Sequence, residues 1–188
     1  MNSEDKFRKI RQQKAKKIAT ERIENKRNQF KELEIFHFTD KRNLESISKY
    51  GLLGWESLES PPYNYKREVN YYPASNIPAP GSTYGRSRYL DVRKGYTNHI
   101  RLTKDKGHPM TGSAEYWNSL DLVFLKISNQ IIDDLVCLFS DTNATKTGAI
   151  INHDISTFLN STDIQAEVLV EGHIPSQYIL DVIYDWRN

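Results

Sequence analysis

Apolar and polar residues follow strand-like patterns at several places along the chain. Alternation or short apolar runs predict strands at residues 34–38, 98–103, 122–127, 136–139, 166–170 and 180–184. A helix follows the first strand; Thr39 or Asp40 caps its start, and Tyr50-Gly51 ends it with a glycine stop signal. Further helical segments are predicted at residues 86–94 and 154–160.

The predicted strands outnumber the helices that could connect them in parallel. We therefore expect an α+β domain with two packed, largely antiparallel sheets and flanking helices, and not a doubly wound parallel sheet. With 188 residues, the chain is long enough for one domain with its own core. We expect this domain to span residues 32–188, preceded by a separate helical arm at residues 1–31.

The arm has no glycine or proline, and its apolar residues fall near helical spacing at Phe7, Ile10, Ala15, Ile18, Ala19 and Ile23. Residues 1–31 hold eleven Lys and Arg against four acids, whereas the rest of the chain holds 15 against 20. The pattern predicts one long amphipathic helix whose thin apolar stripe packs on the domain. Its basic face suits an anionic partner such as phosphate groups, and the alternative is a plainly solvated helix.

Residues 54–83 contain Pro61, Pro62, Pro73, Pro78 and Pro80, and they predict an irregular excursion. Long ordered loops on small domains are usually binding loops or lids. The single cysteine, Cys137, sits in an apolar run and is expected to be a core thiol.

Several function classes lack their usual signatures. No apolar stretch is long enough to span a bilayer, and the charged N-terminus is unlike a signal peptide, so we expect a cytoplasmic protein. The five histidines are scattered without metal-ligand spacing, and there is no G-x-S-x-G, G-x-G-x-x-G or P-loop pattern. We expect no metal, and any chemistry would use Glu, His and Arg.

One carboxylate and one histidine stand within apolar alternations. Glu167 lies in a late predicted strand, and His37 lies in the first strand, with Thr39 one strand period away on the same face. A carboxylate against a ribose can stabilise the positive charge that develops when a glycosidic bond breaks. Glu171 points to the same strand face and is a weaker candidate. The alternatives are a surface-facing Glu on an edge strand and a satisfied core histidine.

These residues lie in blocks that resemble a known family. Ile35-Phe36-His37-Phe38-Thr39, then Asn43 to Ile47 and Tyr50-Gly51-Leu52, looks like the NAD-binding opening of ADP-ribosyltransferases, in which a strand carries H-x-T and a helix ends in G-L. The later blocks are similar, in the same order, to those of DarT-like DNA ADP-ribosyltransferases: Arg88 to Gly95, Asn98 to Arg101, His108-Pro109-Met110, Leu138 to Ala144, and Ala166 to Val170 followed by Ile174-Pro175.

The resemblance implies an ADP-ribosyltransferase fold and a toxin of a toxin–antitoxin pair. Such a toxin uses NAD to modify a base of single-stranded DNA, and a macrodomain antitoxin reverses the reaction. The residue match makes Glu167 the catalytic glutamate and Arg88 the active-site arginine, with Arg93 as its competitor. It assigns NAD binding to His37, Thr39, Asn43, Gly51, Leu52 and Arg88, and DNA contacts to Tyr89, Arg93, Lys94 and His108.

A basic and aromatic patch supports a nucleic-acid substrate, because such a mixture suits base stacking and phosphate contacts. It comprises Tyr84, Tyr89 and Tyr96 with Arg86, Arg88, Arg93, Lys94 and Arg101. The loop Ser140 to Asn143 is either a turn rich in capping residues or part of an active-site rim. Rival functions are ADP-ribosylation of RNA or protein, RNA 2′-phosphotransfer, and a nucleic-acid-binding module without catalysis.

Overall fold

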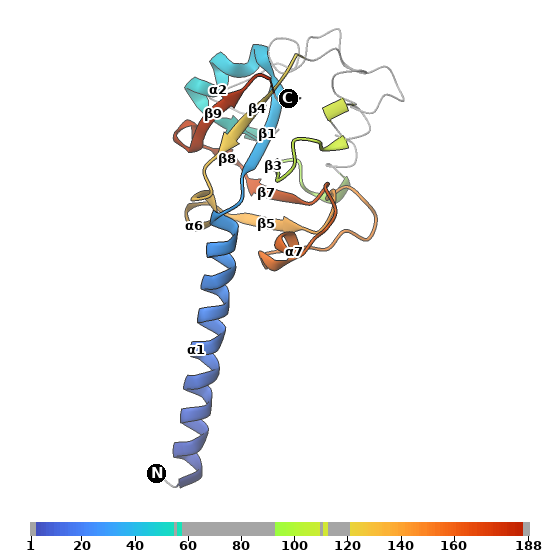
Figure 1. Cartoon of the computed structure of the whole chain (residues 1–188). Coiled ribbons are helices and arrows are strands. Elements are labelled where there is room, and N and C mark those ends of the chain that lie inside the picture. Colours follow the sequence, from blue (N-terminus) through green and yellow to red (C-terminus); the bar gives the residue numbers. More distant parts are fainter. Residues whose placement is uncertain (1–2, 55, 58–92, 110, 113–120, 186–188) are drawn as a thin grey trace.

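The computed structural model describes residues 3–54, 56–57, 93–109, 111–112 and 121–185. A long helix, α1 (Ser3–Lys31), leads into an α+β domain (Figure 1), which confirms the predicted class. The domain's strands are β1 (Ile35–Asp40), β2 (Leu52–Leu53), β3 (His99–Thr103), β4 (Leu122–Ile127), β5 (Cys137–Ser140), β6 (Ile151–Asn152), β7 (Glu167–Glu171), β8 (His173–Ile174) and β9 (Ile179–Ile183). Its helices are η1 (Lys41–Asn43), α2 (Leu44–Tyr50), α6 (Ile131–Asp134), α7 (Ser156–Leu159) and η3 (Ser176–Tyr178).

The strands are divided between sheets differently from the expectation. One sheet of seven strands has the order β6-β5-β7-β3-β1-β4-β9, and a second sheet pairs β2 with β8. Every described pairing is antiparallel, as the sequence predicts.

The large sheet is divided in the middle, between β1 and β3. These two strands share the single register pair Phe36 with Thr103, whereas β1 pairs with β4 over six residues. Figure 1 shows β1 running steeply while β7 and β5 run across it. The two packed sheets expected from the sequence are therefore a single large sheet with a narrow junction between β1 and β3, accompanied by a small two-stranded sheet.

Alternation along the strands assigns the core to one face of the sheet. Side chains on this face include Ile35, Leu125, Leu102, Val168 and Phe139, all at most 5% exposed. The helices cover them with Phe30 of α1, Ile47 of α2, Ile131 of α6 and Phe158 of α7. Residues one position along on β3 and β7, Arg101, Thr103 and Glu167, therefore point to the opposite face.

Helix α1 contacts the domain only near its C-terminal end among its described side chains. Phe30 is fully buried against Phe139 and Phe158, while residues 7–25 are exposed. The expectation that the apolar stripe packs on the domain is wrong, because Phe7, Ile10 and Ile18 are 64%, 50% and 41% exposed. The helix projects away from the sheet (Figure 1).

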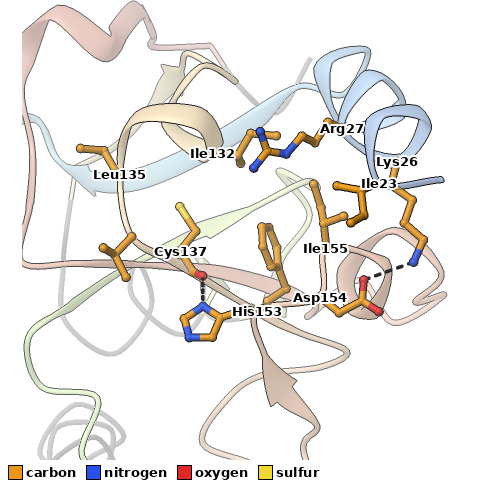
Figure 2. A pocket seen from close by; sticks show the side chains of 11 residues that line it. Ile23, Lys26, Arg27, Ile132, Leu135, Cys137, His153, Asp154 and Ile155 are labelled. Carbon is orange, nitrogen blue, oxygen red and sulfur yellow. Dashed lines mark hydrogen bonds and ion pairs between the residues drawn. The ribbon is translucent and has the colours of Figure 1, made fainter. Parts of the chain in front are cut away.

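A cavity of 590 Å³ lies at the base of α1 (Figure 2). Its lining includes Ile23 and Arg27 of α1, Ile132 of α6, and Cys137 of β5. Burial raises the pKa of the Cys137 thiol to about 12, so the side chain behaves as the expected core thiol.

The predicted strands all correspond to described strands, with ends shifted by one or two residues. The short elements β2, β6, β8, α6 and η3 were not predicted. Most of the proline-rich excursion, including all five prolines, and most of the predicted helix at 86–94 lie outside the described residues, although Arg93 and Lys94 are helical. Among the described segments, no helix has the length and apolar character needed to cross a membrane.

Candidate active site

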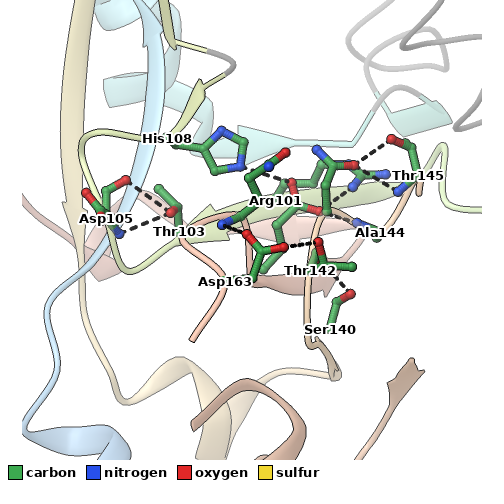
Figure 3. A network of polar contacts seen from close by, with 12 residues as sticks. Arg101, Thr103, Asp105, His108, Ser140, Thr142, Ala144, Thr145 and Asp163 are labelled. Atoms are coloured by element: carbon green, nitrogen blue, oxygen red, sulfur yellow. Dashed lines mark hydrogen bonds and ion pairs between the residues drawn. The ribbon is translucent and has the colours of Figure 1, made fainter. Parts of the chain in front are cut away.

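Glu167 begins β7, a strand that pairs with β3 on one side and β5 on the other. The residue is 4% exposed, and its neighbours in the chain, Ala166 and Val168, are fully buried. A buried carboxylate is stable only where partners satisfy it, so its surroundings are built from polar groups (Figure 3). This excludes the alternative of a surface-facing Glu. The competing acid, Glu171, is exposed at the far end of the strand.

Arg101 of β3 is the charged partner of this carboxylate. Its Nη1 donates to Glu167 Oε2 at 2.5 Å, and the guanidinium is about one-fifth exposed. Arg101 stands opposite Leu169 in the strand register, two pairs away from the pair of Thr103 with Glu167, so both charged side chains lie on one face. From the sequence alone, Arg101 is assigned only to the basic and aromatic patch. Its position within the apolar alternation of β3 is the signal that could have identified it.

The loop after β5 supplies a second donor. The backbone N–H of Ala144 donates to the same Oε2 of Glu167 at 2.9 Å. Side-chain bonds shape the loop, with Ser140 Oγ donating to the Thr142 carbonyl and Asn143 Oδ1 accepting from the Thr145 N–H. The segment 140–143 is therefore a turn rich in capping side chains that also borders Glu167.

Asp163 stabilises this loop by accepting hydrogen bonds from two of its side chains. Thr142 Oγ1 donates to Asp163 Oδ2, and Lys146 Nζ donates to the same oxygen at 3.2 Å (Figure 3). The bond from Thr142, a backbone N–H from Gln165 and the charge of Lys146 lower the pKa of Asp163 to about 2. The carboxylate therefore stays ionised and holds the loop over the whole physiological range.

His108 approaches Glu167 from another side. Its Nε2 is 3.9 Å from Glu167 Oε1, and the side chain is 2% exposed. Burial lowers the pKa of His108 to about 4, and the positive charge of Arg101 acts in the same direction. The imidazole is therefore neutral at pH 7. Its ring also lies 6.2 Å from that of Phe38 in β1, which connects Glu167 with the first strand.

His37 of β1 makes a second connection to the site. Its Nδ1 is 3.0 Å from the backbone carbonyl of Arg101, and because a carbonyl only accepts, Nδ1 holds the proton. Burial lowers the pKa of His37, so the ring is neutral and Nε2 is a hydrogen-bond acceptor. In a flat sheet His37 and Glu167 would face opposite sides, because Phe36 stands opposite Thr103. The imidazole of His37 instead contacts the backbone carbonyl of Arg101, which lies beyond the single register pair between β1 and β3.

Thr39 and Asn43 form a buried pair next to His37. Asn43 Nδ2 donates to Thr39 Oγ1 at 3.1 Å, and both side chains are less than 10% exposed. Thr39 stands opposite Val123 and His37 opposite Leu125, so Thr39 and His37 share a strand face. The structure thus brings three of the predicted NAD-binding residues together.

Gly51 and Leu52 make structural contacts. Gly51 ends α2 with φ of 76°, its N–H donates to Ile47, and a Cβ there would collide with the Ile174 carbonyl oxygen. Leu52 pairs with Ile174 and is buried in the core. Only glycine allows β8 to approach the end of α2 this closely.

The predicted DNA-contacting residues are dispersed. Arg93 is exposed, and Lys94 Nζ donates to the carbonyls of Ala144 and Lys146, so that it supports the loop beside Glu167. His108 is buried at Glu167. Arg88 and Tyr89 lie outside the described residues. Within the described ranges, no group of three or more His, Cys, Asp or Glu side chains is placed to hold a metal ion.

The chain is similar to solved structures, although no family model and no curated protein matches it. Among solved structures, it is similar to Thermus sp. 2.9 DarT in complex with ADP-ribosylated single-stranded DNA, with a TM-score of 0.57, 18% identity, and coverage of 82% of this chain and 83% of that one. The same DarT in complex with NAD⁺ gives a TM-score of 0.54 at 18% identity, with the same coverage of both chains.

A third similar structure is Thermosipho africanus DarTG in complex with ADP-ribose. It gives a TM-score of 0.55 and 19% identity, covering 80% of this chain. The chain spans 43% of the length of that protein. Taken together with the α+β architecture, these likenesses establish that the chain has a DarT-like ADP-ribosyltransferase fold.

Proposed function

We propose that the protein is an NAD-dependent ADP-ribosyltransferase that acts on a base of single-stranded DNA. The observation that supports this most strongly is the buried Glu167, held by Arg101 and the Ala144 N–H and connected through Arg101 to His37. The fold agrees, because similar structures contain NAD⁺ and ADP-ribosylated single-stranded DNA.

NAD would supply the ADP-ribosyl group, with nicotinamide as the leaving group. Glu167 is suited to stabilise positive charge on the ribose, because its carboxylate is fixed before the substrate arrives. Preorganised charge in a site shielded from water stabilises a charged transition state more than the same group does in water. One oxygen, Oε2, receives both described donors, which orients Oε1 toward the side of His108.

His37 and Thr39 would hold the other side of NAD. Because Nδ1 of His37 donates to Arg101, Nε2 accepts, and a ribose hydroxyl is a fitting donor. Thr39 lies on the same strand face, and Asn43 fixes its hydroxyl. These groups fit a polar co-substrate that presents hydroxyl and amide donors.

We assign the role of active-site arginine to Arg101. The sequence match chose Arg88, with Arg93 as competitor, but Arg101 is the arginine in contact with Glu167 among the described residues. Its guanidinium pairs with the carboxylate and orients it, and its carbonyl orients His37. Arg88 is retained as a proposed contact to the base or pyrophosphate.

The similar proteins support a proposal about the biological role of this chain. One is a DarTG chain, so we propose that this protein acts as a toxin whose modification is reversed by a macrodomain antitoxin in the cytoplasm. Tyr89 and Arg93 remain proposed DNA contacts. His108, proposed from the sequence as a DNA contact, is better suited to the NAD side, because it is buried against Glu167.

The test incubates the protein with NAD labelled in the adenylate part and with separate pools of single-stranded DNA, RNA and protein. We expect label on single-stranded DNA, strongly reduced for Glu167→Gln and retained for the exposed control Glu171→Gln. Label on RNA or protein alone would replace the DNA assignment by one of its rivals. If NAD is not consumed with any acceptor, a nucleic-acid-binding module becomes the better account.

A further inference from the structure

Helix α1 presents a long exposed surface that the candidate active site does not use. Residues 7–25 are exposed without interruption, and at 1.5 Å per residue they extend roughly 28 Å from the domain. Within this stretch there are seven Lys and Arg and two acids, so its net charge is +5. A polyanion is the partner that such a surface attracts most strongly.

The base of the helix is fastened by a different set of cations. Lys26 pairs with Asp154 at 3.2 Å, and Arg27 and Lys31 both pair with Asp133 at 2.9 Å. Phe30, fully buried, completes the attachment. Two acids of the domain thus pair with the three cations of the last turns, whereas residues 7–25 are exposed to solvent.

The distribution of charge around α1 favours single-stranded nucleic acid over a folded acidic protein as the binding partner. At 100° per residue, the cations are spread around the whole circumference of the helix: Arg8, Lys9, Arg11, Lys14, Lys16 and Lys17. A helix bound in a protein groove needs one coherent apolar face, and Lys14 interrupts the stripe of Phe7, Ile10 and Ile18. A single strand can wrap the helix, and Phe7, 64% exposed, offers a ring for base stacking.

We propose that residues 7–25 of α1 form a second binding surface for single-stranded nucleic acid, which holds the substrate strand while a base enters the site at Glu167. The nature of that strand, DNA, rests on the proposed function. The binding itself does not depend on catalysis.

The experiment measures binding of a fluorescent oligo-dT of 20 nucleotides by anisotropy between 50 and 300 mM salt. The variant Arg8→Gln, Arg11→Gln, Lys14→Gln, Lys16→Gln removes four charges at exposed positions and keeps helix-forming residues. For a single strand, each lost phosphate contact lowers the slope of log K against log salt by about 0.7, so four contacts lower it by roughly 3.

Two controls isolate the charge. Lys14→Arg with Lys16→Arg keeps the charge and should keep the slope, and Gln12→Ala with Gln13→Ala changes neutral positions on the same helix. Hydrolysis of NAD without DNA should be unchanged in the four-Gln variant, because these positions lie outside the site. If wild type shows no NAD hydrolysis or transfer, the proposed function fails while the binding result still stands.

An unchanged affinity and salt slope in the four-Gln variant would overturn the proposal. So would a wild-type preference for a blunt duplex over oligo-dT that the four-Gln variant abolishes, because α1 would then be a duplex-binding helix.

Discussion

His37 and Glu167 are joined through a single residue, Arg101. The backbone carbonyl of Arg101 accepts from His37 Nδ1 at 3.0 Å, and its guanidinium donates to Glu167 Oε2 at 2.5 Å. One strand, β3, therefore orients a histidine of β1 with its main chain and a glutamate of β7 with its side chain. Any change at Arg101 should affect both.

Substitution of Arg101 tests the charged pair. Arg101→Gln leaves a buried carboxylate with the Ala144 N–H as its remaining described donor, and we expect a loss of about 2–4 kcal/mol in the free energy of unfolding. The double variant Arg101→Gln, Glu167→Gln should recover much of that loss, because no unpaired charge remains. Urea unfolding of the four species gives the coupling free energy.

Arg27→Gln is the matched control. Its ion pair with Asp133 is about half exposed on the arginine side, so its removal should cost at most about 1 kcal/mol. Equal losses for Arg27→Gln and Arg101→Gln would show that the pair with Glu167 is an ordinary surface contact.

Removal of the His37 side chain should weaken NAD binding. His37→Ala deletes the proposed acceptor for a ribose hydroxyl, and one such hydrogen bond is worth about 1 kcal/mol, so the Kd for NAD should rise roughly 5- to 10-fold. His153→Ala is the control, because His153 Nδ1 also donates to a strand carbonyl, that of Cys137, at 3.0 Å. Calorimetry that finds equal NAD affinities for both variants would remove His37 from the site.

Burial of His108 predicts a dependence of stability on pH. Its pKa falls from an ordinary 6.5 to about 4 in the folded protein, so between these values the unfolded chain binds more protons. The contribution of His108 to the free energy of unfolding is therefore fully present above pH 6.5. It decreases by up to about 3 kcal/mol as the pH falls to about 4.

His108→Gln tests this dependence. The variant should show a shallower decline in stability between pH 6.5 and 4 than wild type, measured by urea unfolding at half-unit intervals. Asp163 titrates lower, with a pKa of about 2, so the two effects are separable. Parallel curves for wild type and variant would mean that His108 is not buried as described.

Substitution of Gly51 by alanine should destabilise the protein more than the same substitution at Gly148. Both have positive φ, 76° and 84°, but a Cβ at Gly51 meets the Ile174 carbonyl and lies 2.7 Å from His173 Nε2, whereas at Gly148 it meets open space. Gly148→Ala should cost about 1–2 kcal/mol from backbone strain, and Gly51→Ala should cost at least 1 kcal/mol more. Thermal unfolding that ranks the two in the reverse order would contradict the close approach of β8.

The strand pattern of the domain could be predicted from the sequence because burial enforces it. Val168 and Val170 face the core, and Glu167 alternates away from it, so the period of two was visible along β7. The two-residue strands β2, β6 and β8 have no period to detect. Their pairing depends on tertiary contacts such as the approach of β8 to Gly51.

The site could be predicted only in part, for a related reason. Glu167, His37 and Thr39 stand out as polar residues in apolar strands. Arg101 is assigned from the sequence to the basic and aromatic patch, because its contact with Glu167 depends on which strands are neighbours. The donor at Ala144 is a backbone group, and no side-chain pattern marks it.

For the helical arm at residues 1–31, the sequence predicts a contact that the structure does not have. The apolar spacing of the arm predicts packing on the domain, but only the last turns contact it. Their cations pair with Asp133 and Asp154, and Phe30 packs in the core against Phe139 and Phe158. Periodicity identifies a helix face and does not identify what covers it.

The central claim is that Glu167 stabilises charge on the ribose of NAD, and a single-turnover assay tests it most directly. Labelled NAD and single-stranded DNA are mixed with excess wild type or Glu167→Gln, and transfer of label to DNA is followed in time. The account predicts a Kd for NAD within about 3-fold of wild type and a transfer rate lower by about 10²- to 10³-fold. Transfer by Glu167→Gln at the wild-type rate would contradict it.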